Sequence, residues 1–496
     1  MLQLALILAF TASFKIVPKP EKNSCSTISE NISDIRQDTQ PSHMSFTTDK
    51  QTLEDLHIFG KHGGESISNI FNRCSTRGGA AVLEEMFRYP LSGHEAINKR
   101  SSIIQSFAAL GTVFPFKSSD FDAAEPYLEN TDERSKLTTQ ENSVARKLTN
   151  MIAMDVNTQL IYKGAEALVE LMKKAAELMN ELTANEFYIE EKEELLTILH
   201  HPAFTDILNS KGKLSHEQIA AFDVLLRFKQ REQIEKLLRL IYNLDAYLSI
   251  AKVANERKFV FPKALPGNQQ DLVKLEGLYH PLLKKAVPNN IHVTTENNII
   301  FLTGANMAGK STFMKSLSIA MYLAHAGFPV AAKKMEFTVL DGVYTTINLP
   351  DNLGMGASHF YAEVLRVKHM AQELRAKKDL FIVFDELFRG TNVKDAYEAT
   401  IAIVSAFAKK RKSIFVISTH IIEAGDVLRE KYRNINFVYL PTRMNGNQPA
   451  YTYTLEQGIT GDRHGMVIIQ NEKILDILQN GKKKPRKKTA YELPHR

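Results

Sequence analysis

The stretch FLTGANMAGKST, residues 301–312, places Gly304, Gly309, Lys310 and Ser311 at the spacing G-x-x-x-x-G-K-S. The apolar run NIIFL leads into it, and the helical pattern KSTFMKSLSIAMYLA follows. Glycines let successive backbone N–H groups point at an anion, and the N-terminus of a helix adds partial positive charge. The spacing predicts a strand–loop–helix unit that binds nucleotide phosphates. Lys310 would reach the β- and γ-phosphates, and Ser311 would hold Mg²⁺.

Two further apolar runs end in polar residues. LFIVFDE ends at Asp385 and Glu386, and SIFVISTH ends at Thr419 and His420. Carboxylates at the edge of an apolar strand are costly unless something uses them. We therefore predict that Asp385 positions Mg²⁺ through water and that Glu386 is the general base for an attacking water. His420 is predicted to hydrogen-bond the γ-phosphate, because open α/β sheets bind ligands beyond the carboxyl ends of their strands.

The pattern from Leu53 to about Leu265 is helical. AINKRSSIIQSFAAL and KGAEALVELMKKAAELMNELTA both space apolar residues by three and four. Ser215 and Gln218 form a capping box, and apolar positions then recur without proline or glycine to Val253. This predicts one helix over about 216–256, roughly 60 Å long, which would serve as a lever or arm. An ordinary bundle helix is the alternative interpretation.

The prolines and glycine of FVFPKALPGNQQ mark a boundary just after Val260. Beyond it, near-continuous apolar strands alternate with helical patterns, which predicts a mainly parallel sheet covered on both faces. The predicted fold class is α + α/β: a helical core or lever domain over 45–265, then a P-loop, ABC-type ATPase domain over 266–480. Phe261 is a candidate for stacking on the adenine ring, with a core role as the alternative.

Composition excludes several classes of protein. Hydrophobic residues make up 44% and charged residues 24%, which is ordinary for a globular protein. The two cysteines, Cys25 and Cys74, exclude a disulfide framework and a Cys-rich zinc site. The net charge of +6 is carried by residues 482–496, so the rest of the chain is not a uniformly basic nucleic-acid coat. Residues 481–496 are predicted to be a basic, disordered tail; contact with phosphates is the alternative.

The first residues, MLQLALILAFTASFK, contain a short apolar run. No Lys or Arg precedes this run, and no clear A-x-A cleavage site follows it, which argues against a signal peptide. We predict that residues 1–44 are an unstructured leader or a mis-assigned start, with Met44 as a candidate start. Since no later segment reaches about 18 unbroken apolar residues, the remainder is predicted to have no membrane segment and to be cytoplasmic.

Several segments, in the same order along the chain, resemble one family. Residues 301–470 resemble the ATPase domain of MutS-type DNA mismatch repair proteins. TGANMAGKSTFMKS is similar to the family's phosphate loop, DELFRGTN to its D-E-x-x-R-G-T segment, and STHIIE to its Thr-His switch. GASHFYAE is similar to its G-x-S-x-F-x-x-E segment, EGLYHPLL to its His-Pro lead-in, and DRHGMVII to a late segment. LEDLHIF and CSTRGGAAVLEEMFRYPLSGHEAINKR resemble the start of its helical core. The resemblance covers roughly 50–115 and 240–480.

The resemblance implies an ATPase that uses ATP and Mg²⁺, binds DNA and forms a homodimer with composite ATP sites. Ser358 would reach the partner's γ-phosphate in trans, although it would cap a helix on a purely structural interpretation. Arg389, Gly390 and Thr391 would lie at the dimer seam. ATP binding would close the dimer and move helical levers that encircle DNA. The implied nucleotide-binding residues are Gly304, Ala305, Asn306, Met307, Ala308, Gly309, Lys310, Ser311, Thr312 and Ser358.

The sequence also departs from the family pattern. Ala305 and Ala308 stand where Pro and Gly are usual, and Asn392 stands where Ser is common. The helical core begins near residue 50, which leaves no room for the N-terminal mismatch-reading and connector domains, and neither a Phe-x-Glu wedge nor an Smr nuclease is evident. ATP hydrolysis is therefore better supported than mismatch recognition. The alternatives are a nucleotide-dependent scaffold that binds a protein partner, and an ABC-like transporter ATPase. The S-x-F-x-x-E segment and the helical front half argue against the transporter.

Overall fold

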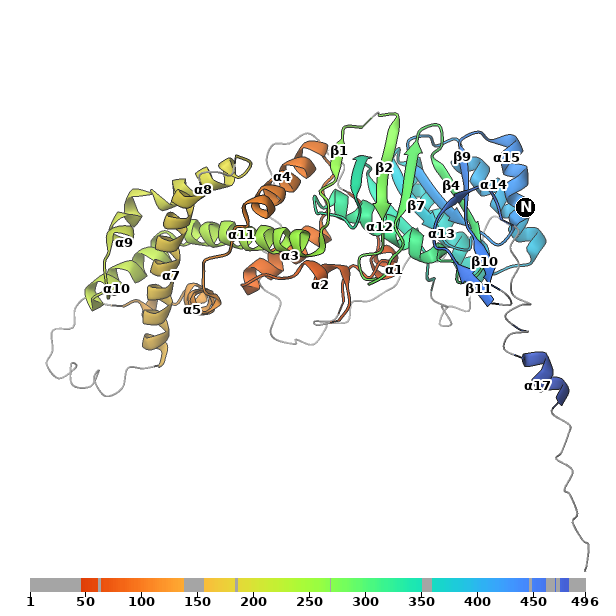
Figure 1. The fold of residues 1–496 in the computed structure, drawn as a ribbon. Coiled ribbons are helices and arrows are strands. Elements are labelled where there is room, and N and C mark those ends of the chain that lie inside the picture. Colours follow the sequence, from red (N-terminus) through yellow and green to blue (C-terminus); the bar gives the residue numbers. More distant parts are fainter. Residues whose placement is uncertain are drawn as a thin grey trace, which may run out of the picture. The chain divides into compact units, whose positions relative to one another are not determined.

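The structure is a computed structural model, and Figure 1 shows its ribbon. It describes residues 46–60, 64–137, 156–182, 186–267, 269–349, 359–445, 448–460, 469 and 473–480. The predictions for the leader at 1–44 and for the tail at 481–496 lie outside these residues, as does most of the DRHGMVII segment. Among the described helices, none is both long and apolar enough to cross a membrane.

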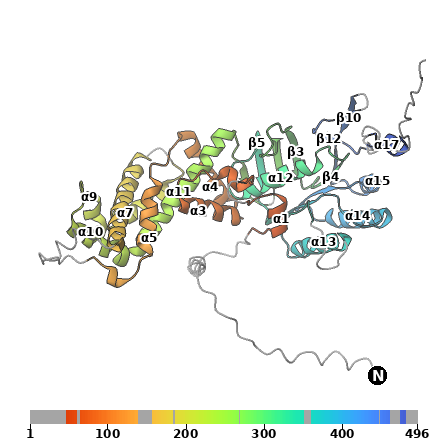
Figure 2. The ribbon, with the colours of Figure 1, turned by 90° about the horizontal axis from the view of Figure 1, so that it is seen from below.

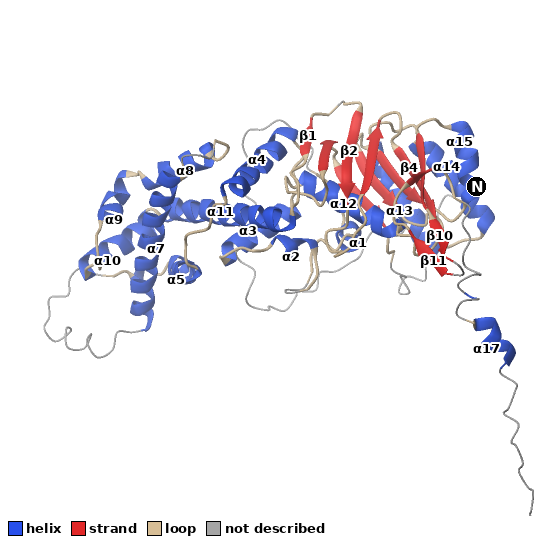
Figure 3. Ribbon diagram, in the orientation of Figure 1, coloured by secondary structure: helices blue, strands red, loops and turns tan. Residues whose placement is uncertain are grey.

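The first half of the described chain is helical (Figure 3). The two periodic segments singled out in the sequence form α4 and α7, so these helix predictions are confirmed. Their apolar faces are buried, as the three- and four-residue spacing requires. The helices are α1 (Lys50–Asp55), α2 (Ile67–Phe71), α3 (Arg77–Arg88), α4 (His94–Leu110), α5 (Ser118–Glu129), α7 (Val156–Glu181), α8 (Ile189–Leu199), α9 (Thr205–Asn209), α10 (His216–Asp223) and α11 (Arg231–Arg257).

The predicted continuous helix over 216–256 is wrong in its middle. The capping box of Ser215 and Gln218 starts α10 as expected, but a π-helical segment, Val224–Lys229, separates α10 from α11. Helices without proline or glycine commonly break at such segments. Here the break contains Arg227, which is fully buried and donates from Nε to Asp223 Oδ1 at 2.6 Å. Sequence periodicity does not reveal a buried ion pair, so the interruption was not predicted.

The second half contains a six-stranded sheet in the order β12-β9-β4-β8-β7-β6. The five strands from β9 to β6 are parallel to their neighbours, and only the edge strand β12 is antiparallel. The mainly parallel sheet agrees with the prediction from the apolar runs. The strands are β4 (Ile299–Gly304), β6 (Gly342–Thr346), β7 (Leu380–Phe384), β8 (Ile414–Ser418), β9 (Ile435–Leu440) and β12 (Glu456–Gln457).

Helices cover both faces of this sheet. Ile300 and Leu302 of β4 belong to the hydrophobic cluster that contains α12 (Lys310–His325). Ile299 and Phe301 point to the opposite face, into a cluster with α13 (His359–Arg375) and α14 (Val393–Phe407). Figure 2 shows α13, α14 and α15 (Ile422–Lys431) side by side along that face. The alternation along β4 explains why the strand is apolar without interruption.

A second, four-stranded sheet in the order β1-β5-β2-β3 was not predicted. Its strands alternate between buried and exposed positions, a weaker signal than a continuous apolar run. A short hairpin also lies near the end of the chain. The strands are β1 (Lys263–Leu265), β2 (Asp271–Leu278), β3 (Asn289–Thr294) and β5 (Lys334–Thr338), the hairpin is β10 (Thr442–Asn445) with β11 (Gln448–Tyr451), and the last helix is α17 (Ile474–Asn480).

The first described segment packs on the sheet of the second half. The buried carboxylate of Asp55, at the end of α1, accepts hydrogen bonds from the Thr345 hydroxyl and the Ile347 N–H, each at 2.8 Å. Thr47 pairs with Gly342 at the start of β6, where a Cβ would lie 2.4 Å from the Thr47 carbonyl oxygen. Helix α1 is therefore fixed to β6 rather than to the helices that follow it in sequence.

His325, the last residue of α12, joins three parts of the fold. It is fully buried, its Nδ1 donates to the Met321 carbonyl at 2.7 Å, and its Nε2 accepts the Leu340 N–H at 3.0 Å. Its own carbonyl accepts the N–H of Leu91, which lies between α3 and α4. These bonds require the neutral ring, and burial lowers the pKa of His325 from 6.5 to about 4.

We predict that His325 makes the protein less stable in mild acid. Above pH 6.5 the ring is neutral in the folded and unfolded states, so its bonds contribute fully. Between pH 6.5 and 4 the unfolded chain takes up a proton that the folded chain does not, and stability falls. The loss at pH 5 should be about 2 kcal/mol. Urea unfolding at pH 7.5 and 5 of wild type and His325→Gln measures it, with the exposed His200→Gln as control. An equal pH dependence in wild type and His325→Gln would refute the assignment.

Candidate functional site

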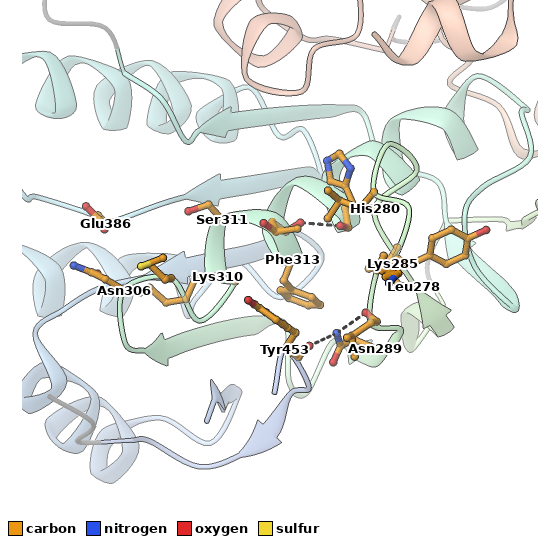
Figure 4. Close-up of a pocket in the computed structure, with 18 residues that line it drawn as sticks. Leu278, His280, Lys285, Asn289, Asn306, Lys310, Ser311, Phe313, Glu386 and Tyr453 are labelled. Carbon is orange, nitrogen blue, oxygen red and sulfur yellow. Dashed lines mark hydrogen bonds between the residues drawn. The ribbon is translucent and has the colours of Figure 1, made fainter. Parts of the chain in front are cut away.

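A cavity of about 650 Å³ lies at the carboxyl end of β4. It is lined by the loop that joins β4 to α12, called the glycine loop below, and by residues of the four-stranded sheet. Figure 4 shows Asn306, Lys310 and Glu386 toward one end and Asn289 and Tyr453 toward the other. The lining residues come from four separate parts of the chain. They are Leu278, Tyr279, His280, Leu283, Lys285, Ala286, Val287, Asn289, Asn306, Met307, Gly309, Lys310, Ser311, Thr312, Phe313, Ser316, Glu386 and Tyr453.

The loop between β4 and α12 requires its two glycines. Gly304 has φ +146°, and a Cβ there would lie 3.1 Å from the Leu440 carbonyl oxygen. Gly309 has φ +101° and starts α12 directly before Lys310. L-residues rarely adopt either conformation. The loop thus presents the N-terminus of α12 to the cavity, as predicted.

The ten residues implied by the family resemblance divide into three groups. Asn306, Met307, Gly309, Lys310, Ser311 and Thr312 line the cavity. Gly304, Ala305 and Ala308 belong to the same loop outside the lining, and Ala308 is buried. Ser358 lies outside the described residues.

Lys310 is buried, and its ammonium group donates to the carbonyl oxygens of Gly304 at 2.9 Å and Ala305 at 3.2 Å. Burial lowers the pKa of Lys310, because the charged form is desolvated; Asp385 and Glu386 oppose the shift. A buried ammonium group that lines the cavity and has carbonyl oxygens as its hydrogen-bond partners is suited to bind an anion there.

Asp385 follows β7, and hydroxyl groups hold both of its carboxylate oxygens. The Ser311 hydroxyl donates to Oδ2, and the Ser418 hydroxyl donates to Oδ1 at 2.6 Å. A carboxylate next to a hydroxyl at the start of α12 is an oxygen donor set of the kind that Mg²⁺ prefers, usually together with waters and substrate phosphates. Ser311 and Asp385 therefore fit the predicted magnesium ligands.

Glu386 is held by the side chains of His420 and Arg389. His420 Nε2 lies 2.8 Å from Oε1, and Arg389 donates from Nη1 to Oε2 at 2.8 Å. These contacts, first the hydrogen bond from His420, lower the pKa of Glu386 to about 2, although burial opposes the shift. The backbone of Glu386 has φ +54°, an uncommon conformation for a residue with a side chain. His420 therefore reaches the site, but its observed partner is Glu386.

Another part of the cavity wall contains apolar and aromatic side chains, those of Tyr279, Val287, Phe313 and Tyr453, beside the polar side chains of His280, Lys285 and Asn289. The ring of Tyr453 lies close to Gly309, where a Cβ would be 3.0 Å from the ring. Asn289 fixes this wall, since its side chain donates to the Tyr453 carbonyl at 2.9 Å. None of these residues was predicted for the site. Val287 and Tyr453 lie in loops without a motif, whereas Tyr279 and Phe313 lie inside family-like segments whose pattern does not single them out.

Phe261 does not line the cavity and packs against the hydrophobic core, so the core alternative is correct.

Glu363 is a further residue near the site that was not predicted from the sequence. It lies on α13 with a side chain only 8% exposed, and it accepts the backbone N–H groups of Arg389 and Gly390, each at 3.3 Å. A Cβ at Gly390 would lie 2.5 Å from the Phe360 nitrogen, so glycine is needed for this close approach. Burial raises the pKa of Glu363. Glu363 thereby joins α13 to the backbone of Arg389 and Gly390. The sequence signal for it was its place as the last residue of the S-x-F-x-x-E segment.

A strand, a glycine loop and a helix N-terminus that face paired carboxylates are typical of α/β proteins that bind nucleotides. Comparison with known proteins agrees with the sequence resemblance. The family model for MutS domain III matches residues 51–251, and that for MutS domain V matches residues 300–486. The chain belongs to the MutS family.

Three relatives, each named DNA mismatch repair protein MutS, illustrate the similarity. The protein of Fusobacterium nucleatum is 29% identical over 243 residues, covering 48% of this chain and 26% of the relative. That of Persephonella marina is 28% identical over 254 residues, covering 49% and 28%. That of a Geobacillus species is 26% identical over 322 residues, covering 63% and 35%. The chain thus spans about a quarter to a third of the length of these curated relatives.

We predict that Lys310→Ala weakens the binding of ATP by about tenfold or more, since a hydrogen bond from a charged group contributes roughly 1.5–3 kcal/mol. Titration of a fluorescent ATP analogue measures the affinity. Lys315→Ala is the control, because Lys315 lies on the same helix and outside the lining of the cavity. An unchanged affinity in Lys310→Ala would show that the loop does not hold the phosphates.

Proposed function

We propose that the protein is an ATPase that binds ATP with Mg²⁺ and hydrolyses its γ-phosphate. One observation carries the proposal: side chains that follow three parallel strands meet at the glycine loop. Lys310 and Ser311 follow β4, Asp385 and Glu386 follow β7, and His420 follows β8. Membership of the MutS family supports it.

The cavity differs in charge and polarity from one part to another, and this difference would orient the bound nucleotide. The triphosphate lies along the N-terminus of α12, beside Lys310 and Glu386, because the dipole and the ammonium group favour negative charge there. The adenine and ribose lie toward Tyr279 and Tyr453, where the wall offers aromatic surface. The volume of about 650 Å³ is in the range of small-molecule sites.

The chemistry assigned to the site is in-line attack of water on the γ-phosphate. Glu386 orients the water and accepts its proton, and Lys310 neutralises the charge that develops on the phosphate oxygens. Bound Mg²⁺, held by Ser311 and Asp385, would supply further neutralisation of that charge. In the observed arrangement both oxygens of Glu386 are occupied by His420 and Arg389. His420 would therefore exchange Glu386 for the γ-phosphate when ATP binds, and so report its presence.

The family supplies the wider proposal. We propose that two copies form a homodimer with composite ATP sites, in which Ser358 reaches the partner's γ-phosphate and Arg389, Gly390 and Thr391 lie at the seam. The helices over 45–265 would act as levers on DNA, driven by an ATPase domain over 266–480. The curated relatives are named for DNA mismatch repair, and a DNA repair or recombination role is proposed for this chain. The cytoplasmic location stays a prediction.

The alternative function is a nucleotide-dependent scaffold that binds a protein partner rather than DNA, which the near-neutral body of the chain allows. DNA binding at several salt concentrations distinguishes the two. We expect binding to mismatched, branched or plain duplex DNA, and stimulation of ATP turnover by one of them. The affinity should fall steeply with salt, with a logarithmic slope of about −0.9 per phosphate contacted. No binding to any of the three at low salt would favour the scaffold.

We predict that Glu386→Gln retains ATP binding and loses turnover by about 10²–10⁴-fold, the usual contribution of a general base. Steady-state phosphate release and titration of a fluorescent ATP analogue measure the two properties. Glu430→Gln, exposed on α15, is the control for loss of an ordinary glutamate. If turnover survives in Glu386→Gln, a different group acts as the base.

A further inference from the structure

Ser418, the last residue of β8, contacts both carboxylate residues that follow β7. It is fully buried. Its hydroxyl donates to Asp385 Oδ1 at 2.6 Å and accepts the backbone N–H of Glu386 at 2.9 Å. Its carbonyl accepts the N–H of Leu387 at 3.1 Å. One side chain thus uses both its donor and its acceptor capacity on the two acidic residues of the site.

The contact with Asp385 fixes the direction of that carboxylate. With Oδ1 held by Ser418, Oδ2 faces the hydroxyl of Ser311 at the start of α12. Rotation of the carboxylate would break the hydrogen bond to a fully buried hydroxyl, and an unpaired buried polar group costs about 1–3 kcal/mol. The orientation of the Asp385 carboxylate toward the glycine loop is therefore fixed by a residue of a different strand.

The contact with Glu386 supports an unfavourable backbone conformation. Glu386 has φ +54°, and such a residue persists only where its surroundings hold it. The Ser418 hydroxyl holds the backbone N–H, and the ring of His420, two residues after Ser418, holds the carboxylate. The end of β8 therefore fixes Glu386 at both its backbone and its side chain.

We propose that Ser418 is a positioning residue with two effects. It directs the Asp385 carboxylate toward the magnesium ion of bound MgATP, and it holds the backbone of Glu386 in its positive-φ conformation. This inference rests on the proposed ATPase function and goes beyond it, since neither the motifs nor the comparisons assign a role to Ser418. Ser418 acts through Asp385 and Glu386, and lies outside the residues that line the cavity.

The chain offers a matched control at the other end of the same strand. Ser413, directly before β8, is also buried, and its hydroxyl accepts the backbone N–H of Leu380 at the start of β7 at 3.0 Å. Each of the substitutions Ser413→Ala and Ser418→Ala therefore removes a buried hydroxyl that hydrogen-bonds to β7 or to the residues that follow it. Only the hydroxyl of Ser418 makes this contact at the site.

The test measures how much Mg²⁺ strengthens the binding of a fluorescent ATP analogue, as the ratio of its dissociation constants in EDTA and in Mg²⁺. Ser418→Ala should reduce this ratio by about tenfold relative to wild type, the effect of one hydrogen bond to a charged group. Ser413→Ala should leave the ratio unchanged. In the background of Asp385→Ala, Ser418→Ala should cause no further change, because its partner is gone.

The outcomes separate this inference from the function on which it rests. Urea unfolding without nucleotide and metal shows whether each variant folds, and Ser418→Thr, which keeps the hydroxyl, should restore the ratio if Ser418→Ala is unstable. A ratio in Ser418→Ala equal to that of wild type, or a further loss in the Asp385→Ala background, would overturn the role of Ser418. If wild type binds no ATP with or without Mg²⁺, the proposed ATPase function fails, and this inference fails with it.

Discussion

The burial of α12 is the constraint on which the rest of the structure depends. The helix begins at Lys310 beside the cavity and ends at His325 against the helices of the first half, and most of its residues are buried. At its far end, Tyr322 donates to the Phe87 carbonyl at 2.6 Å, and the carbonyl of His325 accepts the N–H of Leu91. Because closely packed interiors transmit displacement rather than absorb it, a shift of the N-terminus of α12 has a direct path to α3 and α4.

The electrostatics of the site follow from placing charged groups at the ends of buried strands. The charged groups there are costly to bury unless they are paired. Asp385 is held by two hydroxyls, Glu386 by His420 and Arg389, and Lys310 by backbone carbonyls. These are contacts among the site's own residues. Under the proposed function, a bound triphosphate and metal ion would compete for several of these contacts.

Connections across the sequence unite the motifs into one site. Glu363 joins the start of α13 to the backbone of Gly390, and Ser418 joins the end of β8 to Asp385. Asp55 holds the segment after β6, which leads toward α13. In each case a buried carboxylate or hydroxyl satisfies backbone or side-chain groups of a distant segment. Buried polar atoms need hydrogen-bond partners, which explains why these groups occur where they do. A single sequence does not show which distant residue is the partner.

The sequence by itself determined the strand–loop–helix unit, the parallel strands and the helical first half. These rest on local properties: the conformations that Gly304 and Gly309 must adopt, the apolar runs, and the three- and four-residue spacing of α4 and α7. The tertiary structure alone decided the break between α10 and α11, the aromatic wall of Tyr279 and Tyr453, and the pairing of His420 with Glu386. These depend on groups far apart in the chain, and no periodicity records which buried charge meets which partner.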